Sequence, residues 1–486
     1  MLKKSNLHAY QADLVEHLAD GDESLVFVEM GLGKTVATLT AVEQIIREDA
    51  ARGKKRRFLV VAPRRVALHV WPKEVEKWAH LKHLKVVTAI GTAAKRLHAV
   101  MDPSAHIVTI NYENIRWLLD KFPKGTLPFY GVIYDEVDKM KAPSTARFAA
   151  LRYRADEFKW RVGMTGTPAP ESLQNVWGPS YLVTAKRDTD QPQARGRPAM
   201  KAALGSSYDR FCQRYFSSDF HGYKLEPVPG AFRAVSEAIA DYTFTAQASD
   251  HLDLPELIVQ DHVYELPKKV MDQYEEFENE FVLALERGDQ LADDDEWQEA
   301  FAEASNAAVL KNKLRQVCSG FVYHFDERGA RQTAWLHDQK MQAYKDVVSE
   351  LMGEPHLAVY GYQAEHEKLG FKNRLGGGIS DTAEQHILAQ WNERKISCLA
   401  MHPASAGHGL NLHEGGAHHI CFLTLPWSRG LYDQTVARLH RMGQGKSVVV
   451  HRFIALGTVE ESVVEALSSK GAVQQQIVNA LKKRRR

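Results

Sequence analysis

The sequence predicts an α/β fold with parallel sheets, divided between two domains. Short apolar runs of β-forming residues alternate with helix-patterned stretches in both halves of the chain, and polar or glycine-rich loops follow several of these runs. A chain of 486 residues also exceeds what a single hydrophobic core ordinarily holds. We therefore expect an N-terminal domain over residues 1–245 and a C-terminal domain over residues 246–486, with the junction between Tyr242 and Pro255.

Composition excludes several classes of protein. A formal net charge of +1 excludes a uniformly basic nucleic-acid binder, so any DNA contact must come from a local basic surface. No stretch approaches the roughly 20 apolar residues of a membrane span, and the N-terminus has no apolar signal segment, so we expect a cytoplasmic protein without membrane contact. The cysteines lack any C-x-x-C spacing, which favours reduced thiols over a zinc site or disulfides. They are Cys212, Cys318, Cys398 and Cys421.

A phosphate-binding loop is predicted between the first strand and the helix that follows it. The sequence from Glu29 to Thr35 is Glu-Met-Gly-Leu-Gly-Lys-Thr, and an amphipathic run from Val36 to Ile46 comes next. The glycines allow backbone amides to turn toward phosphate oxygens, Lys34 would contact the β- and γ-phosphates, and the Thr35 hydroxyl would bind Mg²⁺. Val28 occupies the position of the first glycine of the general P-loop pattern. The predicted ATP-binding residues here are Met30, Gly31, Leu32, Gly33, Lys34 and Thr35.

Two further positions near the N-terminus are candidates for ligand contact. A glutamine amide can both donate to and accept from the edge of adenine, so Gln11 is a candidate for binding the base, with an ordinary surface position as the alternative. Arg64 and Arg65 follow the predicted strand Phe58–Ala62. Basic residues at a strand end suit backbone phosphates of DNA, and a solvated loop is the alternative.

An acidic turn follows the predicted strand from Gly131 to Tyr134. Asp135 lies at the carboxyl end of this strand, where it would bind Mg²⁺ beside the phosphate loop, and Glu136 would orient and deprotonate the attacking water. A strand from Trp160 to Met164 leads to Thr165-Gly-Thr-Pro168, whose hydroxyls are candidates for sensing the state of the carboxylates.

The second half of the chain repeats the strand and helix alternation. We predict strands over His356–Tyr360 and Ser397–Met401, and a capping box from Asp381 to Glu384 before a helix. Arg438 and Arg441 are three residues apart and would project from one face of a helix. Guanidinium groups suit the charge of a transferring γ-phosphoryl group, whereas two surface arginines are the alternative.

Histidines gather in the same part of the chain, and their spacing fits no zinc pattern, so we expect no metal there. These residues are His402, His408, His413, His418, His419 and His440.

Together these motifs resemble the superfamily 2 helicase-like ATPases, and within them the Snf branch of chromatin-remodeller-like DNA translocases. Glu29–Thr35 resembles the first motif of that branch, and Asp135–Asp138 is similar to its Asp-Glu-x-His box, with Asp138 in place of histidine. Pro403–Leu412 resembles the fifth motif and Gln434–Gln444 the sixth. The segment from Leu314 to Cys318 also resembles a segment of the branch, without an assigned role.

The resemblance implies two tandem RecA-like P-loop domains with ATP and Mg²⁺ in the interdomain cleft. Lys34, Glu136, Arg438 and Arg441 would be the catalytic residues, with the arginines as fingers from the second domain, and Gly409 would lie near the nucleotide. The implied activity is ATP hydrolysis coupled to translocation on double-stranded DNA. A strand-separating helicase and a nucleotide-gated DNA-binding scaffold are the alternatives.

We also expect a monomer, and the small size without accessory domains favours a prokaryotic or phage-infected host cell. The sequence identifies no protein partner. Two DNA contacts are expected, from Arg64 with Arg65 and from the loop Ser405–Asn411. The basic tail from Lys482 to Arg486 is expected to be a disordered solubilising end, with added DNA binding or a nuclear address as the alternatives.

Overall fold

A computed structural model of the chain describes residues 1–486 except 189–198, 219–224, 277, 279–311, 327, 377, 405–409 and 486. By packing, the chain divides into two compact units. The first contains Met1–Asp253 and Lys470–Arg486, and the second contains Leu254–Ala406 and Leu410–Ser469. The functional division at residues 245 and 246 stays a prediction.

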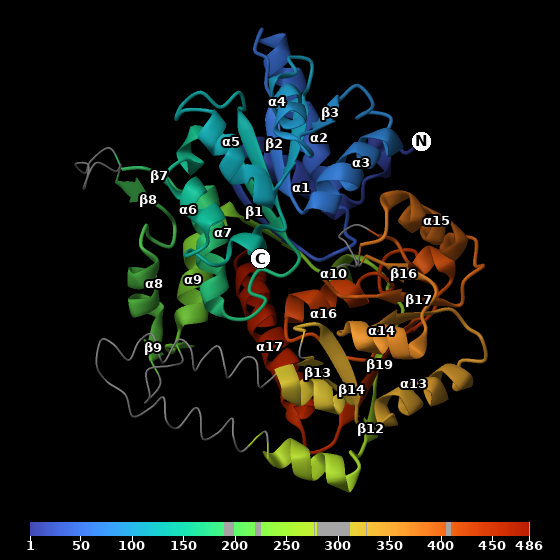
Figure 1. The fold of residues 1–486 in the computed structure, drawn as a ribbon. Helices are drawn as coiled ribbons and strands as arrows, with labels where there is room; N and C mark the ends of the chain where they lie inside the picture. Colours follow the sequence, from blue (N-terminus) through green and yellow to red (C-terminus); the bar gives the residue numbers. More distant parts are fainter. Residues whose placement is uncertain are drawn as a thin grey trace. The chain divides into compact units, whose positions relative to one another are not determined.

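The first unit is built on a seven-stranded sheet in the order β11-β1-β6-β5-β2-β4-β3 (Figure 1). All of its strand pairs are parallel, and β1, β2, β4, β5 and β6 are buried along their whole length. A parallel sheet covered on both faces requires apolar side chains in both directions, which explains the continuous apolar runs in the sequence. The strands are β1 (Glu23–Val28), β2 (Phe58–Ala62), β3 (Val86–Thr88), β4 (Ile107–Asn111), β5 (Gly131–Asp135), β6 (Trp160–Thr165) and β11 (Thr243–Ala246).

Helices and two small hairpins surround this sheet. Helix α7 packs against β1 and β6, and all eight of its residues are buried, which requires its apolar sequence Trp-Gly-Pro-Ser-Tyr-Leu-Val-Thr. The helices are α1 (Ala9–Asp20), α2 (Lys34–Ala51), α3 (Trp71–Lys77), α4 (Ala93–Met101), α5 (Ile115–Lys121), α6 (Ala146–Arg152), α7 (Trp177–Thr184), α8 (Tyr208–Tyr215), α9 (Ala231–Ile239) and α10 (Ala248–His251). The hairpins pair β7 (Lys186–Arg187) with β8 (Met200–Lys201) and β9 (Phe216–Ser218) with β10 (Leu225–Pro227).

The second unit contains a six-stranded sheet in the order β12-β19-β18-β15-β17-β16, again with every pair parallel. Its strands are β12 (Leu257–Tyr264), β15 (His356–Val359), β16 (Arg374–Leu375), β17 (Cys398–Met401), β18 (His419–Phe422) and β19 (Val448–Ala455). An antiparallel hairpin joins β13 (Phe321–Phe325) and β14 (Arg331–Trp335). The helices are α13 (Gln339–Glu350), α14 (Gln363–Leu369), α15 (Asp381–Asn392), α16 (Arg429–Val436) and the start of α17 (Val459–Arg485).

Helix α17 contributes to two hydrophobic cores. Val463 and Leu467 belong to the core of the second unit, whereas Ile477 and Leu481 belong to that of the first. The domain bounds predicted from the sequence, 246–486, place this whole helix in the C-terminal domain. Packing instead places the segment from Lys470 onward with the first unit.

The predicted α/β class with parallel sheets in both halves is confirmed. The predicted capping box from Asp381 to Glu384 is wrong, because the N-cap of α15 is Ser380. Its hydroxyl accepts a hydrogen bond from the Ala383 amide, and the alanine side chain cannot return one. Cys212, Cys318, Cys398 and Cys421 are free thiols. Across the residues that the structure describes, no helix is both long and apolar enough to cross a membrane.

Candidate active site

The predicted phosphate loop connects β1 to α2 in the first unit. Gly31 and Gly33 have φ angles of 83° and 73°, a left-handed conformation that favours glycine. A Cβ atom at Gly33 would lie 2.3 Å from Nε2 of Gln11, so a side chain there would displace the Gln11 amide from its place against the loop. The backbone is therefore shaped as a close-approach loop at the start of a helix, which is where phosphate groups bind.

Lys34 is the first residue of α2, and its side chain reaches back to the start of this loop. Its Nζ donates hydrogen bonds to the carbonyl oxygens of Val28 at 2.7 Å and Glu29 at 3.2 Å. Desolvation lowers the pKa of Lys34, and the nearby carboxylates of Glu136 and Asp135 oppose this shift. The ammonium group therefore lies in a weakly solvated place beside the acidic turn, where a phosphate group would be a strong partner.

Gln11 contacts the loop directly. Its amide nitrogen donates to the Leu32 carbonyl at 3.1 Å, and its amide oxygen accepts from the His8 backbone amide at 3.0 Å. The buried side chain thus joins the start of α1 to the phosphate loop, and its predicted contact with adenine stays a prediction. Met30 lies on the other side of the loop, where it packs against Gly166.

The acidic turn lies at the carboxyl end of β5. The Trp71 indole donates to Asp135 Oδ2 at 2.9 Å, and the Tyr112 hydroxyl donates to the backbone carbonyl oxygens of Asp135 at 2.8 Å and Glu136 at 3.2 Å. Glu136 has φ 58° and ψ 56°, a left-handed conformation that costs energy for a residue with a Cβ and is concentrated at functional sites. Burial, with Glu136 nearby, raises the pKa of Asp135 to about 7. A divalent cation would stabilise the ionised form of this carboxyl group.

The turn after β6 contacts the acidic cluster. The Thr165 hydroxyl donates to Asp138 Oδ1 at 3.1 Å and accepts from the Thr167 backbone amide at 3.0 Å. Burial and the neighbouring Glu136 raise the pKa of Asp138 to about 7. The substitution of aspartate for histidine at position 138 therefore keeps a polar link between the two turns, through a carboxylate rather than an imidazole.

Arg438 and Arg441 lie in the second unit and differ from the sequence prediction in one respect. Helix α16 ends at Val436, so the two arginines lie in the turns that follow it and not on a helical face. Their guanidinium groups nevertheless converge, because both donate to the carbonyl oxygen of Leu410, Arg438 at 3.4 Å and Arg441 at 3.2 Å. The predicted pairing of the two side chains is thus achieved by a shared acceptor.

Further hydrogen bonds hold Leu412, near the end of the glycine-rich loop. The Leu412 amide donates to the Arg438 carbonyl at 3.2 Å, and the Trp391 indole donates to the Leu412 carbonyl at 2.8 Å. The fifth and sixth sequence motifs therefore form one bonded assembly around Leu410 and Leu412. Gly409 and the loop from Ser405 lie outside the described residues, so their predicted contacts stay predictions.

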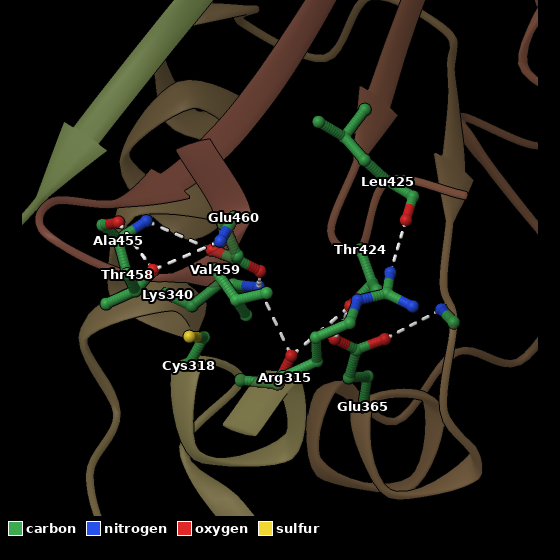
Figure 2. A network of polar contacts seen from close by, with 12 residues as sticks. Arg315, Cys318, Lys340, Glu365, Thr424, Leu425, Ala455, Thr458, Val459 and Glu460 are labelled. Carbon is green, nitrogen blue, oxygen red and sulfur yellow. Dashed lines mark hydrogen bonds and ion pairs between the residues drawn. The ribbon is translucent and has the colours of Figure 1, made fainter. Parts of the chain in front are cut away.

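The segment from Leu314 to Cys318 takes part in a buried polar network of the second unit (Figure 2). Arg315 donates to the carbonyl of Leu425, just after β18, and the Cys318 carbonyl accepts from the Tyr264 hydroxyl at 2.7 Å. The sequence motif alone did not indicate this role, because each partner lies more than 50 residues away along the chain.

The network continues through Ser319 to the ends of two strands. Lys340 forms an ion pair with Glu460 and donates to the Ser319 hydroxyl at 3.2 Å, which lies 3.2 Å from the Thr424 hydroxyl. Thr424 in turn donates to Glu365 at 2.5 Å. These contacts join the segment before α13 to residues that follow β15 and β18 (Figure 2).

The structure thus brings the predicted residues together in two groups. In the first unit, Lys34 lies close to Asp135 and Glu136, and Gln11 supports the loop. In the second unit, Arg438 and Arg441 share one acceptor.

Comparison with known proteins supports one family. Residues 10–184 match the model of the SNF2-related domain. The chain is 33% identical over 472 residues to putative protein p41 of Acyrthosiphon pisum secondary endosymbiont phage 1, with 94% of each chain covered. It is 22% identical to an uncharacterized ATP-dependent helicase of Mycoplasma genitalium, over 95% of this chain and 41% of the helicase. A solved SWI2/SNF2 ATPase core of Sulfolobus solfataricus in complex with double-stranded DNA is 19% identical, covers 99% of this chain and 95% of its own, and has a TM-score of 0.41. The chain therefore spans nearly all of the phage relative and less than half of the helicase.

Proposed function

Because the chain belongs to the SNF2-related family, we propose that it hydrolyses ATP and couples hydrolysis to translocation on double-stranded DNA. The observation that carries the proposal is the placement of Lys34 beside Asp135 and Glu136, with a strained backbone at Glu136. A phosphate-binding cation next to two carboxylates at the carboxyl ends of parallel strands is the arrangement expected for phosphoryl transfer.

The residues of the first unit fit a nucleotide and a magnesium ion. The cradle formed by Gly31 and Gly33 accepts phosphate oxygens where a Cβ would intrude, and Lys34 exchanges its contacts with loop carbonyls for the β- and γ-phosphates. The Thr35 hydroxyl and Asp135 would hold Mg²⁺, which when bound neutralises negative charge on the phosphates. The proposed ATP site also includes two loop residues, Met30 and Leu32, and Gln11, which supports the loop. Gly409 completes the proposed site.

Glu136 is the proposed general base. Its carboxylate orients the attacking water and accepts its proton, while the left-handed backbone at this position sets the direction of the side chain. Arg438 and Arg441 act as arginine fingers, which stabilise the charge that develops on the γ-phosphoryl group. Their shared contact with Leu410 keeps them together until phosphate replaces the carbonyl as partner.

Contact with DNA is proposed for Arg64 and Arg65, which follow β2, and for the loop Ser405–Asn411. Arg64 is exposed and Arg65 half-buried, and both lie just beyond the carboxyl end of the strand. Because the formal charge is nearly balanced, binding rests on a few phosphate contacts. Affinity should then fall steeply with salt and vary little with base sequence.

The experiment that tests this function compares ATP turnover without nucleic acid, with duplex and with single-stranded DNA. Stimulation by duplex, with displacement of a third strand from a triplex but no unwinding of a fork, is the expected result. Stimulation by single strands only, with efficient fork unwinding, would favour a strand-separating helicase. Turnover that no nucleic acid stimulates, or no turnover at all, would favour a nucleotide-gated scaffold.

A matched pair of variants tests the proposed contact of Arg64 and Arg65 with DNA. Replacing Arg64 and Arg65 by alanine should weaken duplex binding and reduce the dependence of log affinity on log salt by about one unit for each phosphate that is no longer neutralised. Arg116→Ala removes an exposed arginine on α5 and should leave that slope unchanged.

We place the activity in the cytoplasm of a prokaryotic or phage-infected cell, in agreement with the phage relative, and propose a monomer as the active form.

A further inference from the structure

A group of imidazole and carboxylate side chains lies at the amino end of β18, apart from the motifs described above. Nε2 of His418 lies 3.0 Å from Glu354 Oε2, and Nε2 of His419 lies 3.7 Å from the same oxygen. One ligand atom from each of the three residues lies within 4.8 Å of the others. The sequence-based expectation was no metal among these histidines; it rested on their spacing alone and did not include Glu354, which is more than 60 residues away in the chain.

The backbone explains why these side chains meet. Neighbouring strand residues ordinarily point to opposite faces of a sheet, but β18 begins at His419, so His418 lies outside that alternation. The two rings pack beside each other with centroids 4.2 Å apart. In the parallel pair of β15 and β18, His356 lies opposite His419, which brings Glu354, two residues earlier, to the same edge.

Further contacts orient the candidate ligands. His419 Nδ1 lies 3.0 Å from His451 Nε2, and His451 Nδ1 lies 2.9 Å from His262 Nε2. Because Nδ1 of His419 has this partner, its Nε2 is the nitrogen directed at Glu354. Hydrogen bonding of the second ring nitrogen is how proteins orient metal-binding histidines. Lys446 Nζ lies 3.5 Å from Oε1 of Glu354, which leaves Oε2 on the side of the histidines.

We propose that Glu354, His418 and His419 form a binding site for one divalent transition-metal ion, with Zn²⁺ as the preferred occupant. Zn²⁺ binds imidazole nitrogen at about 2.0–2.1 Å, so ligand atoms around a tetrahedral ion lie about 3.3 Å apart. The observed separations of 3.0 and 3.7 Å lie on either side of that value. Two imidazoles favour Zn²⁺ over Mg²⁺ or Ca²⁺, which prefer oxygen ligands.

The site joins separate parts of the second unit. The Glu354 side chain is 44% exposed, but its Oε2, the oxygen that faces the histidines, is buried, and the histidines are 12% and 13% exposed. Three protein ligands leave a fourth position for water. The ion would connect the turn between α13 and β15 to the start of β18. Gln444, in the motif that carries the arginines, donates to the neighbouring Ala417 carbonyl at 3.0 Å.

The test uses the full chain without a histidine tag, stripped of metal by a chelator. Zn²⁺ is titrated in competition with a chromophoric chelator, bound metal is measured by mass spectrometry after dialysis, and the visible spectrum of bound Co²⁺ reports coordination geometry. The variants are Glu354→Gln, which keeps the size of the side chain, and His418→Gln. The controls are Glu393→Gln and His324→Gln, which change exposed residues of the same unit.

We expect one equivalent of Zn²⁺, a tetrahedral Co²⁺ spectrum and a higher melting temperature with Zn²⁺ present. Each ligand variant should weaken Zn²⁺ binding by at least 100-fold, because loss of an outer-shell partner alone typically costs 10–100-fold. The controls should bind as the wild type does. No bound equivalent in the wild type would overturn the proposal, and so would wild-type affinity in Glu354→Gln, whose exposed position allows folding without the charge. ATP turnover is not a readout, so the outcome is independent of the proposed ATPase.

Discussion

The buried ion pair of Lys340 and Glu460 allows the stability of the second unit to be tested quantitatively. The two side chains are 0% and 6% exposed, so Lys340→Met would leave a carboxylate buried without its cation. Breaking a buried pair in this way costs about 3–5 kcal/mol. Glu460 keeps the hydrogen bond from the Ala455 amide at 3.0 Å, so we expect the lower part of that range, about 3–4 kcal/mol.

Urea unfolding, combined with hydrogen exchange of peptides from β15 and β19, measures this loss in the second unit. The double variant Lys340→Met with Glu460→Gln removes both charges. It should recover at least half of the lost free energy of unfolding, because the side-chain oxygen of the glutamine can still accept a hydrogen bond from the Ala455 backbone amide. Lys368→Met is the control, since its ion pair with Asp338 is solvent-exposed and should contribute less than about 1 kcal/mol. A Lys340→Met variant within 1 kcal/mol of the wild type, or a double variant no more stable than the single one, would refute the reasoning.

Three further predictions concern the candidate active site. Lys34→Ala should weaken ATP binding, and Glu136→Gln should keep binding but lose hydrolysis; wild-type turnover in Glu136→Gln would exclude it as the base. Arg438→Ala or Arg441→Ala should lower turnover by a factor on the order of 10³ with a smaller change in ATP affinity, whereas a loss of binding alone would indicate a positioning role. Burial raises the pKa of Asp135 from 3.8 to about 7, so between these values the native carboxyl keeps a proton that the unfolded one has lost. Its contribution to the free energy of unfolding therefore falls as the pH rises through this range and is level above it. Asp135→Asn should flatten this slope in urea unfolding, and an unchanged slope would contradict the assignment.

Several elements could be predicted from the sequence because their causes are local. The run Phe58–Ala62 coincides with β2, since a strand buried on both faces needs an uninterrupted apolar run. The turn between β1 and α2 was predictable because its glycines and Lys34 stand together in the chain. The place of Asp135 and Glu136 at the carboxyl end of β5 was predictable because polar residues that end an apolar strand lie at that edge of a parallel sheet. The roles of these residues stay predictions.

Other elements depend on distant contacts and were missed. Strands β18 and β19 were not predicted from the sequence. Arg438 and Arg441 were predicted to lie on a helix because a spacing of three residues suits one. Helix α16 ends earlier, and the two side chains meet through the Leu410 carbonyl instead.

The sequence by itself determined which chemical groups follow β1 and β5, and therefore the glycine turn and the acidic turn, and it placed Arg438 and Arg441 three residues apart. The tertiary structure decided which distant groups meet: Lys340 with Glu460 across 120 residues, and Glu354 with His418 and His419. The physical reason is the distance along the chain over which each influence acts. Periodicity and turn chemistry act between residues a few positions apart, whereas the order of parallel strands, and every contact made across it, results from packing of the whole unit.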